Sequence, residues 1–506
     1  MTIIQKEDFI QSIANAFQYI SYYHSADFIN AMFLAYKKER SGRARNAIAQ
    51  ILINSKMAAE GRRPICQDTG QAVVFLKIGM NVQWNTDLTI DEMVNKGIEL
   101  AYTNPVNPLR ASIVADPAGK RENTKNNTPA VIHMELVSGD NIKVSVAAKG
   151  FGSENKAKFT VLNPSDNIVD WIIEQIPLMG AGWCPPGILG VGIGGNAEKA
   201  MLMAKEALME PVDIQDLYEK IERNHLDSLR IELYEKINDL GIGAQGLGGL
   251  TTVLDVKIKD YPTHAASLPI ALIPNCAATR HLSFILDGNG PIEFLPPEIQ
   301  WPDLKWDTSS LRKVDINSLT RKEISTWKLG ETLLLSGTLI TARDAAHKKM
   351  AELLEKGASL PNNVDLTNKL IYYVGPVPAA ATEVVGPAGP TTATRMDKFT
   401  GLMLEKTQLL GMIGKGERGP EAIKLIKKHQ AVSLIAVGGA AYLISKAITA
   451  SKIIAFEELG MEAMREFIVK DMPVTVAVTT QGESIHEQGP AEWRFKIAEI
   501  KRKDKH

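Results

Sequence analysis

One segment, residues 182–195, constrains the backbone of this chain more than any other. It reads Gly-Trp-Cys-Pro-Pro-Gly-Ile-Leu-Gly-Val-Gly-Ile-Gly-Gly. The two prolines fix φ and remove two N–H donors, and the glycines can adopt positive φ angles that other residues avoid. We therefore expect a loop that can wrap its N–H groups around a small anionic group. Residues 196–209 behind it have helical spacing, and the N-terminus of a helix favours negative charge.

Two other interpretations fit the same segment. Residues 190–195 match G-x-G-x-x-G, the pattern of a dinucleotide-binding loop, but such a loop should follow directly on a buried strand. Here Trp-Cys-Pro-Pro-Gly comes first, and a central strand does not tolerate that sequence. The second interpretation is a plain turn that carries a buried cysteine.

The composition is that of a globular protein and argues against several classes of function. The 506 residues are 45% hydrophobic and 23% charged, with a formal net charge of −1, which speaks against binding to nucleic acid or to a membrane surface. The N-terminus has no apolar signal core, and no unbroken apolar run of about 18 residues occurs. We therefore expect a cytoplasmic protein. Its three cysteines are odd in number and scattered, which favours reduced thiols.

The spacing of apolar residues predicts an α/β first domain with a mixed sheet over residues 1–287. Helical spacing dominates residues 7–59, and residues 214–240 are predicted as one long helix that Asp213 caps and Gly241 ends. Strands are predicted at 72–82, 131–137, 141–148, 251–258 and 268–273.

A second, smaller α/β domain is predicted over residues 313–506. Residues 288–312 contain several prolines among aromatics that we expect to be exposed, and they read as a linker. Beyond them, predicted strands alternate with helices, which indicates an α/β domain. The strands are expected at 332–335, 370–374, 434–437 and 474–478, and the helices at 342–355, after Arg395 and after Pro420.

The three cysteines share a local setting although they are far apart in the sequence. Cys66, Cys184 and Cys276 each lie in a predicted loop next to proline or polar turn residues, and no C-x-x-C pair occurs. Three thiolates from three loops would suit a four-iron cluster with one iron left unligated by protein. A Cys3His zinc site is the alternative, and the spacing alone leaves both open.

Several segments, taken together and in order, resemble the class I fumarases, an iron–sulfur hydro-lyase family. They are Cys66-Gln67-Asp68-Thr69-Gly70, Arg121-Glu122-Asn123-Thr124, Lys149-Gly150-Phe151-Gly152-Ser153-Glu154-Asn155, Cys184-Pro185-Pro186 with its glycines, Gly389-Pro390-Thr391-Thr392-Ala393-Thr394-Arg395-Met396-Asp397 and Glu458-Leu459-Gly460-Met461-Glu462-Ala463. The resemblance covers nearly the whole chain. Two positions depart from it, because Phe151 and Thr394 stand where glycine is usual.

This resemblance implies a homodimer that hydrates fumarate reversibly to S-malate. It implies a [4Fe-4S] cluster held by Cys66, Cys184 and Cys276, whose fourth iron takes the substrate hydroxyl. The related L-tartrate dehydratases share the cysteines and most of these loops, so dehydration of tartrate or another hydroxydicarboxylate is the alternative reaction.

A dicarboxylate pocket needs fixed cations, and the planar fork of arginine suits carboxylates. The candidates lie in or beside glycine- or proline-rich loops or helix starts, and all match positions of the family: Arg110, Arg343, Arg395 and Lys415. Gln67 and Gly150 would add neutral hydrogen bonds, and the resemblance places His264 in the site as a substrate contact. His133, in an apolar run, is expected to be structural.

Removing water from malate means losing hydroxide and a proton from a barely acidic carbon. A Lewis-acidic iron would assist the first event and a general base the second. We assign the carbon base to Thr391, whose pKa Arg395 and Lys415 would lower. Asp68, two residues after Cys66, would then serve the proton balance of the departing hydroxyl.

Three alternatives to these assignments stay open. Thr391 could cap the helix that follows it, since threonine is a common cap. Asp68 could be the carbon base. The protein could also be a structural or sensing metalloprotein without turnover, although the cations of the second domain would then be superfluous.

Overall fold

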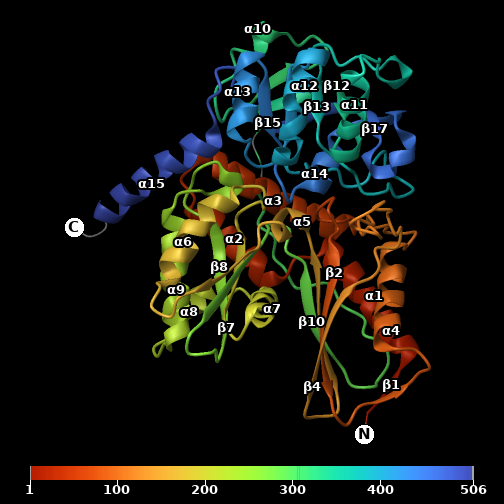
Figure 1. Cartoon of the computed structure of the whole chain (residues 1–506), viewed down its shortest axis with the longest axis vertical. Coiled ribbons are helices and arrows are strands. Elements are labelled where there is room, and N and C mark those ends of the chain that lie inside the picture. The colour runs from red at the N-terminus through yellow and green to blue at the C-terminus, as the bar shows by residue number, and fades with distance from the viewer. Residues whose placement is uncertain (1, 305, 307, 504–506) are drawn as a thin grey trace.

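A computed structural model describes residues 2–304, 306 and 308–503 (Figure 1). The N-terminal region is helical, as the sequence predicts, but it forms three helices, α1 (Lys6–Tyr22), α2 (Ala26–Lys38) and α3 (Gly42–Gly61). Helix α3 ends where Arg62 adopts the left-handed conformation, with φ of 46°. The chain then turns toward Cys66.

The first sheet has the strand order β10-β5-β2-β4 and packs against α1 and α4. Its bounds are β2 (Gln71–Gly79), β4 (Val131–Val137), β5 (Ile142–Lys149) and β10 (His281–Leu286), and α4 spans Ile90–Tyr102. Strands β2 and β4 are parallel, whereas β5 pairs antiparallel with both β2 and β10. The sheet is therefore mixed, as predicted. Strands β1 (Ile3–Gln5) and β3 (Gln83–Asn85) form a small separate pair.

The second sheet has the order β6-β9-β7-β8. Its bounds are β6 (Lys158–Leu162), β7 (Gly187–Gly194), β8 (Val253–Tyr261) and β9 (Leu268–Asn275). The helices around it are α5 (Phe151–Glu154), α6 (Ile168–Met179), α7 (Ala197–Ala207), α8 (Ile214–Glu219), α9 (His225–Asp239) and the 3-10 turn η1 (Ala244–Gly246).

The loop predicted at residues 182–195 is wrong beyond Pro186, because Gly187–Gly194 form β7, a strand between β8 and β9. The glycines serve close packing. A Cβ atom at Gly190 would lie 2.1 Å from the carbonyl oxygen of Ala204, and one at Gly192 would lie 2.0 Å from that of Ala200. Helix α7 therefore rests directly on the strand backbone. Only Gly194 and Gly195, at the turn into α7, have positive φ.

The single helix predicted over residues 214–240 is also interrupted. Helix α8 ends at Glu219, and α9 begins after Asn224, whose side chain forms a capping box with Asp227. Asp213 does not cap α8 through its side chain; instead it pairs with Arg230 and Lys257. Gly241 follows the second helix with φ of 68°.

The later part of the chain forms one seven-stranded sheet in the order β11-β12-β13-β14-β15-β17-β16. The strands are β11 (Arg312–Asp315), β12 (Thr332–Thr341), β13 (Leu370–Tyr372), β14 (Gly411–Gly414), β15 (Val432–Ile435), β16 (Ile448–Ala455) and β17 (Met464–Val478). An additional pairing of β12 with β17 closes five of these strands into a ring. The ring encloses apolar side chains such as Leu333, Tyr372 and Phe467.

Helices and short turns surround this ring. They are α10 (Arg321–Ile324), α11 (Asp344–Glu355), α12 (Asp397–Thr407), α13 (Pro420–Lys428), α14 (Ala441–Lys446) and α15 (Ile485–Lys503), with the 3-10 turns η2 (Pro361–Asn363), η3 (Ala393–Met396) and η4 (Glu457–Glu462). The predicted α/β fold class with mixed sheets is thereby confirmed. Among the described residues, no helix has the length and apolar character needed to cross a membrane.

Strands β1–β10 all precede residue 287, and β11–β17 all follow residue 311. Between them, the described residues form no helix or strand, but they are packed: the ring of Phe294 lies 5.2 Å from that of Phe284, and Trp301 Nε1 donates to Ser55 Oγ at 3.2 Å. The predicted domain limits stay a prediction. Helix α15 adds a second contact between the halves, because it leaves the later half, touches η1 and α9 of the earlier half and then projects from the body of the molecule (Figure 1).

Candidate active site

The fold brings the three cysteines together from three loops. Cys184 precedes β7 and Cys276 follows β9, and the pairing of Ile188 with Asn275 sets them at the same end of the second sheet. The N–H of Ala277 donates to the carbonyl of Cys184 at 3.1 Å. Cys66 and Cys276 pack in one small apolar cluster under Tyr442, a residue of α14.

Burial and the nearby positive charge shift the pKa values of these thiols in opposite directions. Burial raises the pKa of Cys66 and raises that of Cys184 to about 11, and the neighbouring thiolates add to both shifts. Lys415 Nζ lies 3.0 Å from Cys184 Sγ and opposes the rise. Burial by itself would lower the pKa of Lys415, but Cys184 and Cys66 beside it raise that pKa overall. The ammonium group and these two thiols therefore favour the charged forms of one another.

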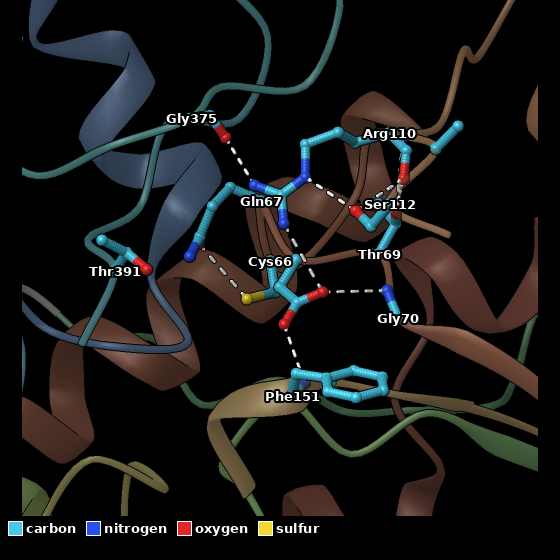
Figure 2. A network of polar contacts seen from close by, with 12 residues as sticks. Cys66, Gln67, Thr69, Gly70, Arg110, Ser112, Phe151, Gly375 and Thr391 are labelled. Carbon is cyan, nitrogen blue, oxygen red and sulfur yellow. Dashed lines mark hydrogen bonds and ion pairs between the residues drawn. The ribbon is translucent and has the colours of Figure 1, made fainter. Parts of the chain in front are cut away.

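The carboxylate of Asp68 is surrounded by donors, and Figure 2 labels three of the residues that provide them, Phe151, Gly70 and Arg110. Its carboxylate accepts from the N–H of Phe151 at 2.8 Å and from that of Gly70 at 3.2 Å, and lies 3.5 Å from Arg110 Nη2. Burial by itself would raise the pKa of Asp68, but Arg110 and Arg280 hold it below its usual range. The backbone N–H of Phe151 makes this contact, and its side chain is partly exposed to solvent, so the departure from glycine leaves this donor intact.

Arg110 joins the two halves of the chain. Its Nη1 donates to the carbonyl of Gly375 at 2.6 Å, and its Nε to Ser112 Oγ at 3.3 Å (Figure 2). Burial lowers its pKa to about 10, which still leaves it charged at neutral pH. A Cβ atom at Gly375 would lie 2.9 Å from Arg343 Nη1, so two predicted arginines meet at this one glycine.

The loop after β13 contributes the threonine and its arginine. The N–H of Thr391 donates to the carbonyl of Tyr373 at 2.8 Å, and the carbonyl of Thr391 accepts from the N–H of Lys415 at 3.0 Å. Arg395 Nη2 donates to Thr391 Oγ1 at 2.5 Å. Gln67, next to Cys66, reaches the same loop, because its Nε2 donates to the carbonyl of Pro390 at 2.9 Å.

Two further sets of polar contacts join the two halves of the chain near Cys66. Arg63 and Glu383 form a buried ion pair with Nη2 and Oε2 2.9 Å apart. Asn54 in α3 is fully satisfied: it donates to the carbonyls of Ile65 and Gly439, both at 3.0 Å, and accepts from two N–H groups of the α14 start at 2.9 Å. The candidate site between the two halves is therefore bordered by non-local contacts.

Comparison with known proteins places this arrangement in a family. A family model described as fumarate hydratase matches residues 10–285, and one described as the fumarase C-terminus matches residues 289–489. The chain belongs to the fumarate hydratase family.

Relatives in distant organisms are named as fumarate hydratases and as a tartrate dehydratase subunit. The chain is 31% identical over 462 residues to the anaerobic class I fumarate hydratase of Escherichia coli, covering 87% of this chain and 82% of the relative. It is 32% identical over 475 residues to fumarate hydratase 2 of Leishmania major, covering 89% and 81%. A putative L(+)-tartrate dehydratase subunit alpha of Methanocaldococcus jannaschii is 38% identical over 276 residues, covering 53% of this chain and 94% of the relative.

One of the predicted site residues, His264, lies far from the three cysteines of its own chain. His264 is exposed on the turn between β8 and β9. Cys276 follows the other end of β9, a strand of eight residues, which places the two about 25 Å apart at the usual rise per residue. Most of the twelve residues from His264 to Cys276 form strand β9, so His264 does not reach the thiols of its own chain.

Sequence reasoning missed three charged residues of the site. Arg280 is buried, and its Nη1 donates to the carbonyl of Asp68 at 2.6 Å. Asp344 pairs with Arg395, and Glu462 lies 3.4 Å from Arg343 Nε. Their only signal was position: Arg280 follows Cys276 by four residues, and Asp344 and Glu462 lie inside segments already singled out.

The donor set fits an iron–sulfur cluster of this family. The buried Nε of Arg280 has no hydrogen-bond partner, and such a donor suits an anionic group beside the thiols. A Cβ atom at Gly438 would lie 2.2 Å from Cys184 Sγ, so the glycine keeps space free at this thiol. In the part of the chain that the structure describes, no three His, Cys, Asp or Glu side chains are grouped closely enough to hold one metal ion.

Proposed function

We propose that this protein catalyses the reversible hydration of fumarate to S-malate and that Cys66, Cys184 and Cys276 hold a [4Fe-4S] cluster. The observation that carries the proposal is the contact of Lys415, from the later half, with the Cys184 thiol of the earlier half at 3.0 Å. Beside it the same half presents Thr391 bonded to Arg395. Cations, a hydroxyl group and three thiols thus share one site between the halves, where ligand pockets are frequent.

When bound, such a cluster supplies an iron without a protein ligand, a Lewis acid for the hydroxyl group that is gained or lost. The protein supplies the binding of the two carboxylates. Arg110, Arg343, Arg395 and Lys415 bring positive charge from both halves, and Gln67 and the backbone at Gly150 add neutral donors. Arg110 is buried, so its contact with a carboxylate would be only weakly screened by water.

Proton transfer falls to Asp68 and Thr391. In hydration, a lone pair of water forms the new C2–O bond while the Asp68 carboxylate takes one water proton. The electron pair of the double bond takes a proton at C3 from the Thr391 hydroxyl, and Arg395, 2.5 Å away, stabilises the alkoxide that remains. Solvent then returns one proton from Asp68 to Thr391. Fumarate and water become malate, and no electron is transferred.

Exchange at C3 of malate tests this assignment. Thr391→Ala should bind malate and retain the cluster, yet fail to incorporate solvent deuterium at C3. Asp68→Asn should still exchange that hydrogen. If Asp68→Asn fails while Thr391→Ala exchanges at the wild-type rate, the two roles are reversed.

A second candidate reaction is dehydration of tartrate, favoured by the relative that matches the earlier half of this chain. Parallel assays of anaerobically purified protein with malate, fumarate and tartrate separate the two. Iron and sulfide contents measured on the same sample test the cluster. A loaded protein that turns over none of the three substrates would support a sensing or structural metalloprotein.

We also propose a cytoplasmic homodimer. Sedimentation of the anaerobic protein tests the assembly, and a monomer that is fully active would refute it.

A further inference from the structure

A chain of charged contacts runs from Thr391 to the surface of the later half. Arg395 Nη2 donates both to Thr391 Oγ1 at 2.5 Å and to Asp344 Oδ2 at 3.0 Å, while its Nε donates to Asp344 Oδ1 at 2.9 Å. Asp344 Oδ2 also accepts from Arg343 Nε at 3.2 Å. The carboxylate of Asp344 therefore holds two of the arginines that the proposed function uses.

The contact between Asp344 and Arg395 is a two-point one. Two parallel N–H donors of one guanidinium edge meet both oxygens of one carboxylate, which fixes the plane of the guanidinium as well as its place. The single bond to Thr391 cannot do this, because it leaves the group free to rotate about that contact. Both side chains are about one-third exposed, so their value lies in geometry more than in net stabilisation.

Asp344 itself is held by the fold. It is the first residue of α11, where negative charge is favourable. The start of the same helix is fixed from η4, since Ala345 N–H donates to Glu462 Oε2 at 2.7 Å. The pKa of Asp344 lies well below its usual value, because hydrogen bonding and charge from Arg395 outweigh the effect of burial. Asp344 is therefore a carboxylate anion whose backbone is held at the start of α11 and whose side chain is held by Arg395.

We propose that Asp344 is a positioning residue: it sets the orientation of Arg395 so that Nη2 points at the Thr391 hydroxyl. This rests on the proposed role of Thr391 as the group that exchanges a proton with C3. Asp344 takes the Nε–Nη2 edge of the guanidinium, and only Nη1 stays outside this pair. Without Asp344, the guanidinium of Arg395 would be free to turn about its single bond to Thr391, and the hydroxyl would lose its fixed donor.

If Asp344 acted only by neutralising charge, its removal would favour substrate binding and would not lower turnover. A carboxylate beside Arg395 also offsets part of its charge, so its loss could strengthen attraction of the dianionic substrate. That would lower the dissociation constant of malate and leave kcat equal or higher. Positioning predicts a fall in kcat with unchanged binding, because misplacing a reacting group by about 1 Å costs roughly a hundredfold.

The test is Asp344→Asn in the full-length, cluster-loaded protein. The substitution keeps the shape of the side chain but sets an NH2 donor against a guanidinium donor, so the two-point contact is lost. We expect kcat to fall about ten- to a hundredfold, with the dissociation constant of malate changed less than about threefold. Wild-type kcat, or a loss that appears wholly as weaker binding, would overturn the proposal.

A matched control separates positioning from stability. Asp397 resembles Asp344, because it is the first residue of a helix and accepts a hydrogen bond from Arg418 Nε at 2.6 Å. It differs from Asp344 in that, among the described residues, no contact links it to Thr391. Asp397→Asn should lower Tm at least as much as Asp344→Asn and leave kcat near that of the wild type. Equal losses of kcat in both variants would make the effect structural.

A double variant ties the effect to the hydroxyl group. In a Thr391→Ala background, Asp344→Asn should cause no further loss of turnover, because the group it serves is absent. Independent, multiplying losses would refute the coupling. Failure of the base assignment is distinguishable: Thr391→Ala would then keep wild-type turnover, whatever Asp344→Asn does.

Discussion

Gly438 offers a sharp test of how the site holds its cofactor. A methyl group at this position would lie 2.2 Å from Cys184 Sγ and 3.1 Å from its Cβ. Ordinary carbon–carbon contacts lie near 3.5–4.0 Å, and sulfur is no smaller, so the thiol must move by more than 1 Å in Gly438→Ala. In the protein without a cluster, the side chain can rotate away at small cost.

A ligated thiolate has no such freedom, because metal–ligand distances tolerate only about 0.2 Å. The backbone at this point is also fixed: the N–H of Gly438 donates to Gln245 Oε1 at 2.8 Å, and Gln245 Nε2 donates to the carbonyl of Pro185 at 3.0 Å. The clash therefore cannot be relieved by moving the loop. We expect normal folding of the cluster-free variant, with Tm within a few degrees of the wild type, but little iron or sulfide after anaerobic reconstitution.

The assay is iron and sulfide per chain, with malate turnover measured on the same sample. Gly42→Ala is the control, since no atom lies within 4 Å of a Cβ built there; it should load and turn over normally. Full cluster content and activity in Gly438→Ala would refute the reasoning, because the Cys184 thiol could then not be the ligand in the rotamer that the structure shows.

Three further predictions concern the thiols, a cation and a buried histidine. Serine in place of any one of the cysteines should abolish turnover and lower the iron content; normal iron and activity would remove that residue from the ligand set (Cys66, Cys184 and Cys276). Arg110→Ala should lower kcat/KM about ten- to two-hundredfold, the equivalent of one charge-assisted contact of about 1.5–3 kcal/mol; wild-type kinetics would exclude it from substrate binding. Burial lowers the pKa of His347 to about 4, whereas an unfolded histidine titrates near 6.5. The folded state then binds fewer protons, so stability should fall by up to about 3 kcal/mol as pH drops from 6.5 to 4, and His347→Gln should flatten this dependence in denaturant titrations; an unchanged slope would contradict it.

Local sequence patterns predicted elements well where the pattern and the packing agree. Strand β5 alternates apolar and polar residues and buries its apolar face on α1. Helix α7 begins where Asn196 caps it. The glycines of β7 misled the same reasoning, because a glycine that allows positive φ and a glycine that allows close approach look identical in sequence. Only the position of α7 against that strand decides between them.

The sequence by itself determined the fold class, and it supplied the proposed thiol ligands and the loops of the proposed reacting groups, because each depends on residue type and short-range conformational preference. It could not determine how these loops meet. Lys415 reaches Cys184 across 231 residues, and Arg280 and Asp344 gain a function only from the neighbours that folding gives them. His264 shows the converse, since a short separation along the chain became a long one in space. The closure of the β12–β17 ring within the later half and the packing of α3 on α14 between the halves are likewise non-local, and they therefore belong to the tertiary structure alone.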